Sequence, residues 1–169
     1  TAGFKQHFMG THFFNPPTYI RLLEIIPGEE TLPEAVDFMK SFCTERLSKD
    51  VIICKDTPNF IANRMGSATN LNAIHLAVKM GMRVEEVDAL CGHVMARLRT
   101  AVFRSSDAIG LDTNFNVVRN LYANVPEDER RDLFVYPPYV EKMIARGMLG
   151  NKTGQGYYKT VIAEDGTEK

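Results

Sequence analysis

The sequence has little of what several specialised classes of protein require. It contains no tryptophan and only three cysteines in 169 residues, and its 20 basic and 21 acidic side chains leave a net charge of -1. A chain whose positive and negative charges are so nearly equal lacks the positive surface that nucleic-acid and membrane-surface binding need. No stretch approaches the roughly 18 consecutive apolar residues of a membrane helix, and the N-terminus lacks the apolar core of a secretory signal. With 44% hydrophobic residues, the chain is predicted to be a folded cytoplasmic protein.

The cysteines do not predict a disulfide framework or a zinc site. Cys43, Cys54 and Cys91 are odd in number, lie far apart and form no C-x-x-C pair. They are interpreted as reduced thiols, mostly buried, that act as small hydrophobic side chains.

Familiar glycine and nucleophile motifs are missing as well. The sequence has no G-x-G-x-x-G, P-loop, H-E-x-x-H or G-x-S-x-G pattern. The nearest approach to a dinucleotide-binding turn is Gly154-x-Gly156, in which Lys159 takes the place of the third glycine. The chain is therefore not expected to carry its own nucleotide-binding loop.

Residues 1–57 have the pattern of a short α/β layer. Three strands are predicted, over residues 4–14, 20–26 and 51–54, because the first run is rich in aromatic residues and the other two are apolar. Between the last two, Thr31-Leu32-Pro33-Glu34 matches a capping box that opens an amphipathic helix. The segment is too short to be a whole α/β domain.

Residues 58–159 have the pattern of a helical domain. Asp56-Thr57-Pro58 is typical of a helix start, because proline is tolerated in the first turn, and this helix is predicted to end at Gly81. Further helices are expected over residues 84–94, 105–122 and 138–146, and one short strand over residues 156–159. The predicted fold class is mostly α, with an all-helical domain preceded by a short α/β segment and followed by a polar tail or linker at residues 160–169.

His12 and Glu24 form the first candidate pair of functional residues. Histidine suits general-base chemistry because imidazole changes charge near neutral pH, although a lone strand histidine is more often structural. Glu24 lies in the apolar run L-L-E-I-I, where a carboxylate is costly unless it is paired. If the strands fold back about Thr18, the midpoint of the two positions, the side chains become near-opposite neighbours. This favours a His–carboxylate dyad; a solvated Glu24 on an edge strand is the alternative.

Asn63 is the third candidate. It is expected in the second turn of the helix predicted from Pro58, where asparagine is a poor interior helix former. Its amide is therefore expected to hold either a ligand oxygen or a nearby backbone group, and the sequence leaves both open. A metal site is disfavoured, because no two of the four histidines share a helix-face or strand-face spacing; they are His7, His12, His75 and His93.

Several of these segments occur together, in this order, in one known family. The sequence resembles the L-3-hydroxyacyl-CoA dehydrogenases of fatty-acid β-oxidation, most closely the dehydrogenase part of multifunctional proteins that also carry an enoyl-CoA hydratase part. The resemblance spans about residues 3–159. It rests on G-T-H-F-F-N-P-P (10–17), L-L-E-I-I (22–26), K-D-T-P-N-F-I-A-N-R (55–64), I-G-L-D-T (109–113) and G-N-K-T-G-Q-G-Y-Y (150–158).

The resemblance implies a function and a role for each candidate. The reaction would be the NAD-dependent oxidation of an L-3-hydroxyacyl-CoA to a 3-ketoacyl-CoA, without a metal, in a protein that forms a homodimer. His12 would be the catalytic base, Glu24 would orient it, and Asn63 would hold the substrate. Residues 1–57 would be the C-terminal part of a truncated NAD-binding Rossmann domain.

The N-terminus and the missing loop also lead to an expectation about the chain as a whole. It begins with Thr1 rather than Met, and the family's nucleotide loop and a catalytic serine would precede this residue. The 169 residues are therefore expected to be a fragment that is inactive alone. The alternative function is a non-catalytic helical module that mediates dimerisation and shapes the substrate cleft.

Overall fold

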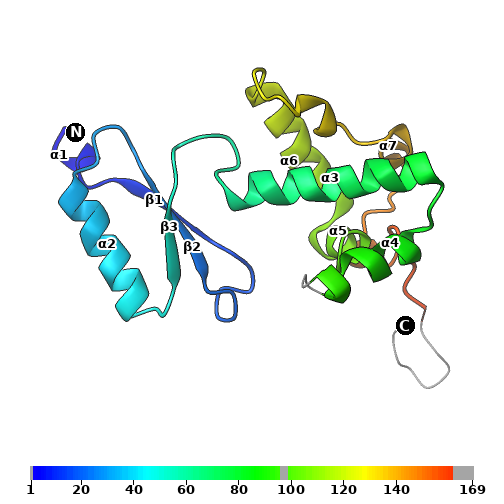
Figure 1. Ribbon diagram of the computed structural model, residues 1–169, viewed down its shortest axis with the longest axis horizontal. Coiled ribbons are helices and arrows are strands. Elements are labelled where there is room, and N and C mark those ends of the chain that lie inside the picture. Colours follow the sequence, from blue (N-terminus) through cyan, green and yellow to red (C-terminus); the bar gives the residue numbers. More distant parts are fainter. Residues whose placement is uncertain (1, 96–98, 162–169) are drawn as a thin grey trace. The chain divides into compact units, whose positions relative to one another are not determined.

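The computed structural model describes residues 2–95 and 99–161, and the chain divides into two compact units, residues 1–63 and 64–169 (Figure 1). The first unit contains α1 (Ala2–Lys5), β1 (Met9–Phe13), β2 (Leu22–Pro27), α2 (Pro33–Glu45) and β3 (Asp50–Ile53). The second unit contains most of α3 (Ala62–Met80), then α4 (Val84–Cys91), η1 (His93–Met95), α5 (Phe103–Ile109), α6 (Leu111–Asn124), η2 (Arg131–Leu133), α7 (Pro138–Ala145) and η3 (Asn151–Thr153).

The sheet of the first unit has the strand order β1-β2-β3. β1 pairs antiparallel with β2, and β2 pairs parallel with β3, while α2 contacts both β2 and β3. The central strand, β2, is buried along four consecutive residues, Leu23 to Ile26, so both of its faces are covered. The predicted short α/β layer with three strands and one main helix is confirmed.

The beginning of the first unit differs from the sequence-based prediction. Residues 4–8 do not belong to a strand, because α1 and a turn precede β1, and the amides of His7 and Phe8 bond to the carbonyls of Phe4 and Lys5. The aromatic residues that suggested a strand are largely exposed: 68% of Phe4 and 58% of Phe8. His7 therefore lies before β1 and not on it.

The predicted capping box at the start of α2 is also wrong. Leu32 occupies the cap position and makes no side-chain cap hydrogen bond. The Thr31 hydroxyl instead accepts a hydrogen bond from the Gly28 amide (2.8 Å) and donates one to the Phe8 carbonyl (2.6 Å). Thr31 thus ties a turn to the start of β1, because tertiary partners compete successfully with the local helix cap.

The start of α3 lies later than the sequence suggested. The helix begins at Ala62 and not at Pro58, because Asn59 (φ 61°) and Phe60 (φ 48°) take the left-handed conformation, which a right-handed helix excludes. The predicted end is confirmed, since α3 stops at Met80 and is followed by Gly81 with φ 65°.

The core of the second unit forms around α3. Its buried face carries Leu71, Ile74 and Ala77, at the spacing of an amphipathic helix. One cluster joins Leu71 to α6 and the segment after it, and the other joins Ile74 and Ala77 to α4 and the start of α5. Their buried members are Leu71, Val118, Leu121, Val125 and Phe134, and Ile74, Ala77, Val87, Val102 and Phe103.

Two further predictions for the second unit are wrong. The single helix expected over residues 105–122 is two helices, α5 and α6, which break at Gly110 with φ 105°. The strand expected over residues 156–159 is not formed; in its place the isolated bridges Gly150↔Gln155 and Gln155↔Lys159 close a small loop.

Two buried aspartates hold this loop and α5 in place. Asp88, on α4, accepts hydrogen bonds from the amides of Val102, Phe103 and Arg104 and from the Tyr158 hydroxyl. Asp107, on α5, accepts hydrogen bonds from the amides of Tyr157 (2.9 Å) and Tyr158 (2.8 Å). Those amides belong to the two tyrosines at the end of the G-N-K-T-G-Q-G-Y-Y stretch. This stretch therefore has a structural role within the second unit.

Of the predicted polar tail, residues 160–169, all but Thr160 and Val161 lie outside the described residues. No helix in the described part of the chain is long and apolar enough to cross a membrane.

Candidate active site

His12 and Glu24 face each other across β1 and β2. They are direct partners in the antiparallel register, and Nδ1 of His12 lies 2.7 Å from Oε2 of Glu24. The carboxylate has 0% exposure, whereas 29% of the His12 side chain is exposed. The predicted His–carboxylate pair is confirmed, and the alternative of a solvated Glu24 is wrong.

The second carboxylate oxygen of Glu24 holds the chain just before and at the start of α3. Oε1 accepts hydrogen bonds from the amides of Ile61 (3.0 Å) and Ala62 (2.8 Å), and the Cys54 thiol also hydrogen-bonds to the carboxylate. The sequence analysis missed these partners. One signal was that Ile61, the residue directly before α3, has no side-chain oxygen that could cap the helix, so the first amides needed an acceptor from elsewhere.

These hydrogen bonds keep Glu24 ionised in a buried position. Burial by itself would raise the pKa of the carboxyl, but the hydrogen bonds from His12, from the Ala62 and Ile61 amides and from Cys54 outweigh it and hold the pKa of Glu24 below its ordinary value of 4.5. Conversely, burial and the neighbouring Glu24 charge raise the pKa of Cys54, so this thiol stays protonated and donates. The site therefore consists of an imidazole beside an ionised carboxylate whose two oxygens both accept hydrogen bonds.

Acid is expected to destabilise the fold through Glu24. A carboxyl with a lower pKa in the folded state contributes stability above its unfolded pKa, about 4.5, and that contribution is lost as the pH falls through the folded pKa. Thermal unfolding can be monitored by circular dichroism at a series of pH values. As the pH is lowered from about 5 to about 3, the midpoint temperature should fall more steeply for the unsubstituted protein than for Glu24→Gln. The same slope in both proteins would mean that Glu24 does not couple protonation to folding.

The His12 ring is oriented by this hydrogen bond and by two aromatic neighbours. With a hydrogen on Nδ1 donated to Glu24, the neutral ring keeps its lone pair on Nε2, which has no hydrogen-bond partner among the described residues. The ring centroids of Phe14 and Phe60 lie 4.5 Å and 5.7 Å from that of His12. Nε2 is thus the nitrogen available to accept a proton.

Asn63 follows the segment that Glu24 binds, but no described contact joins it to His12 or Glu24. It is the second residue of α3 and so belongs to the first helical turn, not to the second as predicted. Its side chain is exposed and makes no hydrogen bond with the part of the chain that the structure describes. The Ala62 amide that binds Glu24 is one residue away.

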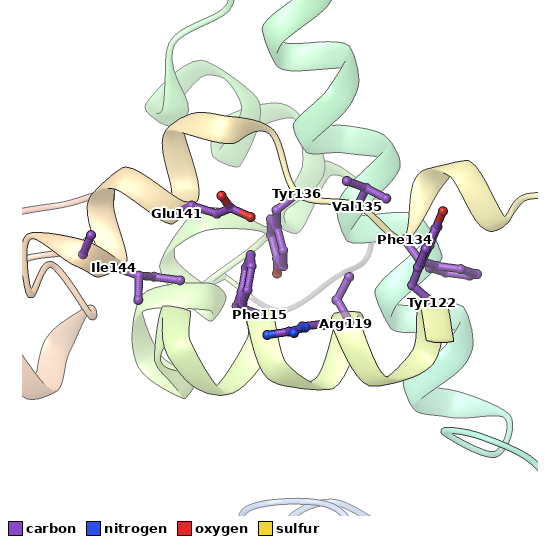
Figure 2. A pocket seen from close by; sticks show the side chains of 10 residues that line it. Phe115, Arg119, Tyr122, Phe134, Val135, Tyr136, Glu141 and Ile144 are labelled. Carbon is purple, nitrogen blue, oxygen red and sulfur yellow. The ribbon is translucent and has the colours of Figure 1, made fainter. Parts of the chain in front are cut away.

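A separate groove of about 760 Å³ lies in the second unit, between α6 and α7 (Figure 2). The rings of Phe115 and Tyr136 stack there with centroids 5.9 Å apart, and Arg119 and Glu141 are the charged residues of its lining. Burial raises the pKa of Tyr136 to about 12, with a further contribution from Tyr139, so the hydroxyl stays protonated. The other lining residues are aromatic or aliphatic, and the lining has no hydrogen-bonded acid–base pair of the His12–Glu24 kind.

Within the described residues, no group of three or more histidine, cysteine or acidic side chains is arranged to hold a metal ion. The three cysteines are free thiols; Cys43 and Cys54 are buried and Cys91 is partly buried.

Comparison with known families agrees with this geometry. Residues 60–160 match the family model described as the C-terminal domain of 3-hydroxyacyl-CoA dehydrogenase, and residues 2–57 match the one described as its NAD binding domain. The chain belongs to the 3-hydroxyacyl-CoA dehydrogenase family. The resemblance drawn from the H-F-F-N-P and P-N-F-I-A-N-R stretches is confirmed.

Matching relatives come from bacteria and from animals, and three bacterial ones illustrate the similarity. A probable 3-hydroxyacyl-CoA dehydrogenase of Bacillus subtilis (strain 168) is 46% identical over 156 residues, which is 92% of this chain and 20% of that protein. The crystal structure of M. tuberculosis FadB2 matches with a TM-score of 0.81 and 28% identity, covering 92% of this chain and 53% of that one. The (S)-3-hydroxybutyryl-CoA dehydrogenase PaaH1 from Ralstonia eutropha matches with a TM-score of 0.78 and 28% identity, covering 90% and 52%. The chain spans about half of either solved structure and a fifth of the Bacillus protein.

Proposed function

We propose that this chain supplies the catalytic base for the NAD-dependent oxidation of an L-3-hydroxyacyl-CoA to a 3-ketoacyl-CoA, in fatty-acid β-oxidation. The observation that carries the proposal is the 2.7 Å hydrogen bond between His12 and the buried carboxylate of Glu24, in a chain of this family. A His–carboxylate pair is suited to removing a proton from an alcohol, because the acid fixes the ring and stabilises the charge that the ring acquires.

His12 and Glu24 have complementary parts in the proposed reaction. Nε2 of His12 takes the proton of the C3 hydroxyl, since Nδ1 is occupied by the hydrogen bond to Glu24. The resulting imidazolium lies against a carboxylate with 0% exposure, where the opposite charges attract strongly. Glu24 also keeps its bonds to the Ile61 and Ala62 amides, so the carboxylate stays in place during proton transfer.

Asn63 is proposed to bind the substrate. Its exposed amide makes no hydrogen bond with the described residues, and it can donate to the oxygen at C3 or to the thioester carbonyl. The neighbouring Ala62 amide is fixed by Glu24, which gives this part of the chain a defined position relative to the catalytic pair.

The cofactor proposed for the reaction is NAD, which, when bound, supplies the hydride acceptor. We propose that residues 1–57 are part of an NAD-binding Rossmann domain and that residues 58–159 are the helical dehydrogenase domain. The strands of the first unit are followed by Phe14-Asn15, Gly28-Glu29 and Cys54-Lys55, and none leads through a G-x-G turn into a helix. The described residues therefore do not fit the phosphate site of a dinucleotide, and no cofactor contact is assigned to them.

An activity assay on the complete encoded polypeptide tests the proposed function. Purified protein should reduce NAD with L-3-hydroxyacyl-CoA substrates, as measured by NADH absorbance, because the base and its carboxylate are already hydrogen-bonded. The D enantiomers of the same substrates are the control, and we expect their rates to be at least about tenfold lower, since the base must meet the hydroxyl in a fixed geometry. An absence of NAD reduction with every L substrate would contradict the proposal.

The partner proposed for the helical unit is a second copy of the chain. Exposed apolar side chains lie along α3 and continue over α4 and η1, next to a groove of about 510 Å³. Four of these exposed side chains line the groove together: Leu76, Met80, Leu90 and Met95. Such a contiguous apolar surface is typical of an interface, and sedimentation of the complete polypeptide over a range of concentrations would show a monomer throughout if the proposal is wrong.

The proposed location is the cytoplasm. The observation that supports it is that the three cysteines are free thiols, which is typical of proteins in a reducing compartment. Fractionation of cells that produce the tagged protein, with recovery in the membrane or secreted fraction, would contradict this location.

A further inference from the structure

The segment before α3 has an unusual concentration of unfavourable features. Asn59 and Phe60 are consecutive residues with positive φ, 61° and 48°. Asparagine tolerates this conformation comparatively well, but for a bulky residue such as phenylalanine it is rare. In addition, Nδ2 of Asn59 is buried and has no hydrogen-bond partner in the described part of the chain. Strained residues of this kind persist only where surrounding contacts hold them, and they tend to occur at functional sites.

The contacts that hold Phe60 come from both sides of it along the chain. Its own amide donates to the carbonyl of Thr57 at 3.0 Å. The next two amides, of Ile61 and Ala62, donate to Oε1 of Glu24. The backbone of Phe60 is thus fixed by the same carboxylate that binds His12 through its other oxygen.

The strained backbone brings the Phe60 ring against His12. The two ring centroids are 5.7 Å apart, with an angle of 54° between the planes, although the residues are 48 positions apart in the sequence. Phe14, two residues after His12, lies at 4.5 Å and 56°. The imidazole therefore has one hydrogen bond and two aromatic contacts, which together oppose rotation of the ring about its bond to the chain.

We propose that Phe60 is a positioning residue that holds the His12 imidazole with Nε2 directed at the substrate hydroxyl. The inference deepens the proposed function and rests on His12 being the base. It gives a role to a phenylalanine that stands at a left-handed position, where glycine or asparagine would be less strained. The hydrogen bond to Glu24 fixes the position of Nδ1, and the Phe60 ring, together with that of Phe14, restrains the plane of the imidazole.

Substitutions at Phe60 in the complete encoded polypeptide test this role. Phe60→Leu and Phe60→Met both remove the flat ring, and we expect each to lower kcat by about tenfold while KM changes by less than about twofold. Phe60→Tyr keeps the ring and should recover most of the parental kcat. Phe38→Leu is the matched control, because Phe38 is 71% exposed on α2 and does not contact His12; it should behave as the parent does.

A spectroscopic measurement separates positioning from general stability. In proton–nitrogen NMR spectra, the His12 ring signals, assigned by their loss in His12→Gln, should shift or broaden in Phe60→Leu and Phe60→Met but not in Phe38→Leu. Parental kcat and parental ring signals in the leucine and methionine variants would overturn the inference. A lower melting temperature with unchanged ring signals would also overturn it, since Phe60 would then serve the fold alone.

The same experiment keeps the inference distinct from the proposed function. If His12→Gln retains parental kcat, His12 is not the base and the proposed function is wrong, whatever the Phe60 variants do. If His12→Gln is impaired but the Phe60 variants are not, the proposed function stands and the positioning role is overturned.

Discussion

Replacing His12 with glutamine should lower kcat of the complete encoded polypeptide by about 100-fold or more, the usual scale for loss of a general base. Glutamine has nearly the length of histidine and can still donate a hydrogen bond to Glu24, so the buried carboxylate keeps a partner. It cannot, however, accept a proton near neutral pH. KM should change much less than kcat, because the base takes up the proton in the transition state and contributes little to binding of the substrate in the ground state.

Steady-state NADH formation between about pH 6 and pH 9 measures this effect, and a melting curve of the same variant controls for folding. Near-parental kcat across that range would remove His12 from the mechanism. Loss of activity with a parental melting temperature would assign the defect to the chemistry and not to the fold.

Replacing Gly156 with alanine should destabilise the second unit by about 3 kcal/mol, the upper part of the usual range for overpacking. A Cβ at this position would lie 2.1 Å from Oδ1 of Asp107 and 2.6 Å from the Cα of Gly150. Neither neighbour can move easily. Asp107 accepts hydrogen bonds from the Tyr157 and Tyr158 amides, and Gly150 has the left-handed φ of 98°.

Urea denaturation of the chain, compared with Gly66→Ala, would measure this difference. Gly66 lies within α3 and an added Cβ would meet no atom within 4 Å, so its replacement should instead stabilise the helix by about 0.5–1 kcal/mol. If both variants unfold at the same urea concentration, the close packing of Gly156 against Asp107 does not limit stability.

The His12–Glu24 pair could be predicted from the sequence because it depends on local chain geometry. The two strands are joined by a short connection, and the observed register pairs positions that sum to 36, which centres the hairpin on Thr18. Glu24 was noticeable because it interrupts an apolar run, and a buried carboxylate needs a partner. For similar reasons the helical pattern after residue 80 predicted α4 and α7 well.

Elements whose ends depend on distant partners could not be predicted in this way. Pro58 was a reasonable helix start by local rules, yet α3 begins at Ala62, where Glu24 reaches across 38 residues to accept the amide hydrogen. The capping box failed for the same kind of reason, because the Thr31 hydroxyl is used by Phe8 and Gly28. A local propensity worth about 1 kcal/mol is easily overridden by such contacts.

The sequence by itself therefore determined the mostly helical class and the pairing of His12 with Glu24, since these follow from periodicity and from residue types at fixed spacing, and its motifs carried the resemblance to the family. Only the tertiary structure decided how that pair is supported. It placed Phe60 against His12 through a left-handed backbone, gave Glu24 its bonds to the start of α3, and packed Gly156 against Asp107. Each of these contacts joins segments far apart in the chain, and one sequence contains no periodic signal for partners that meet only after folding.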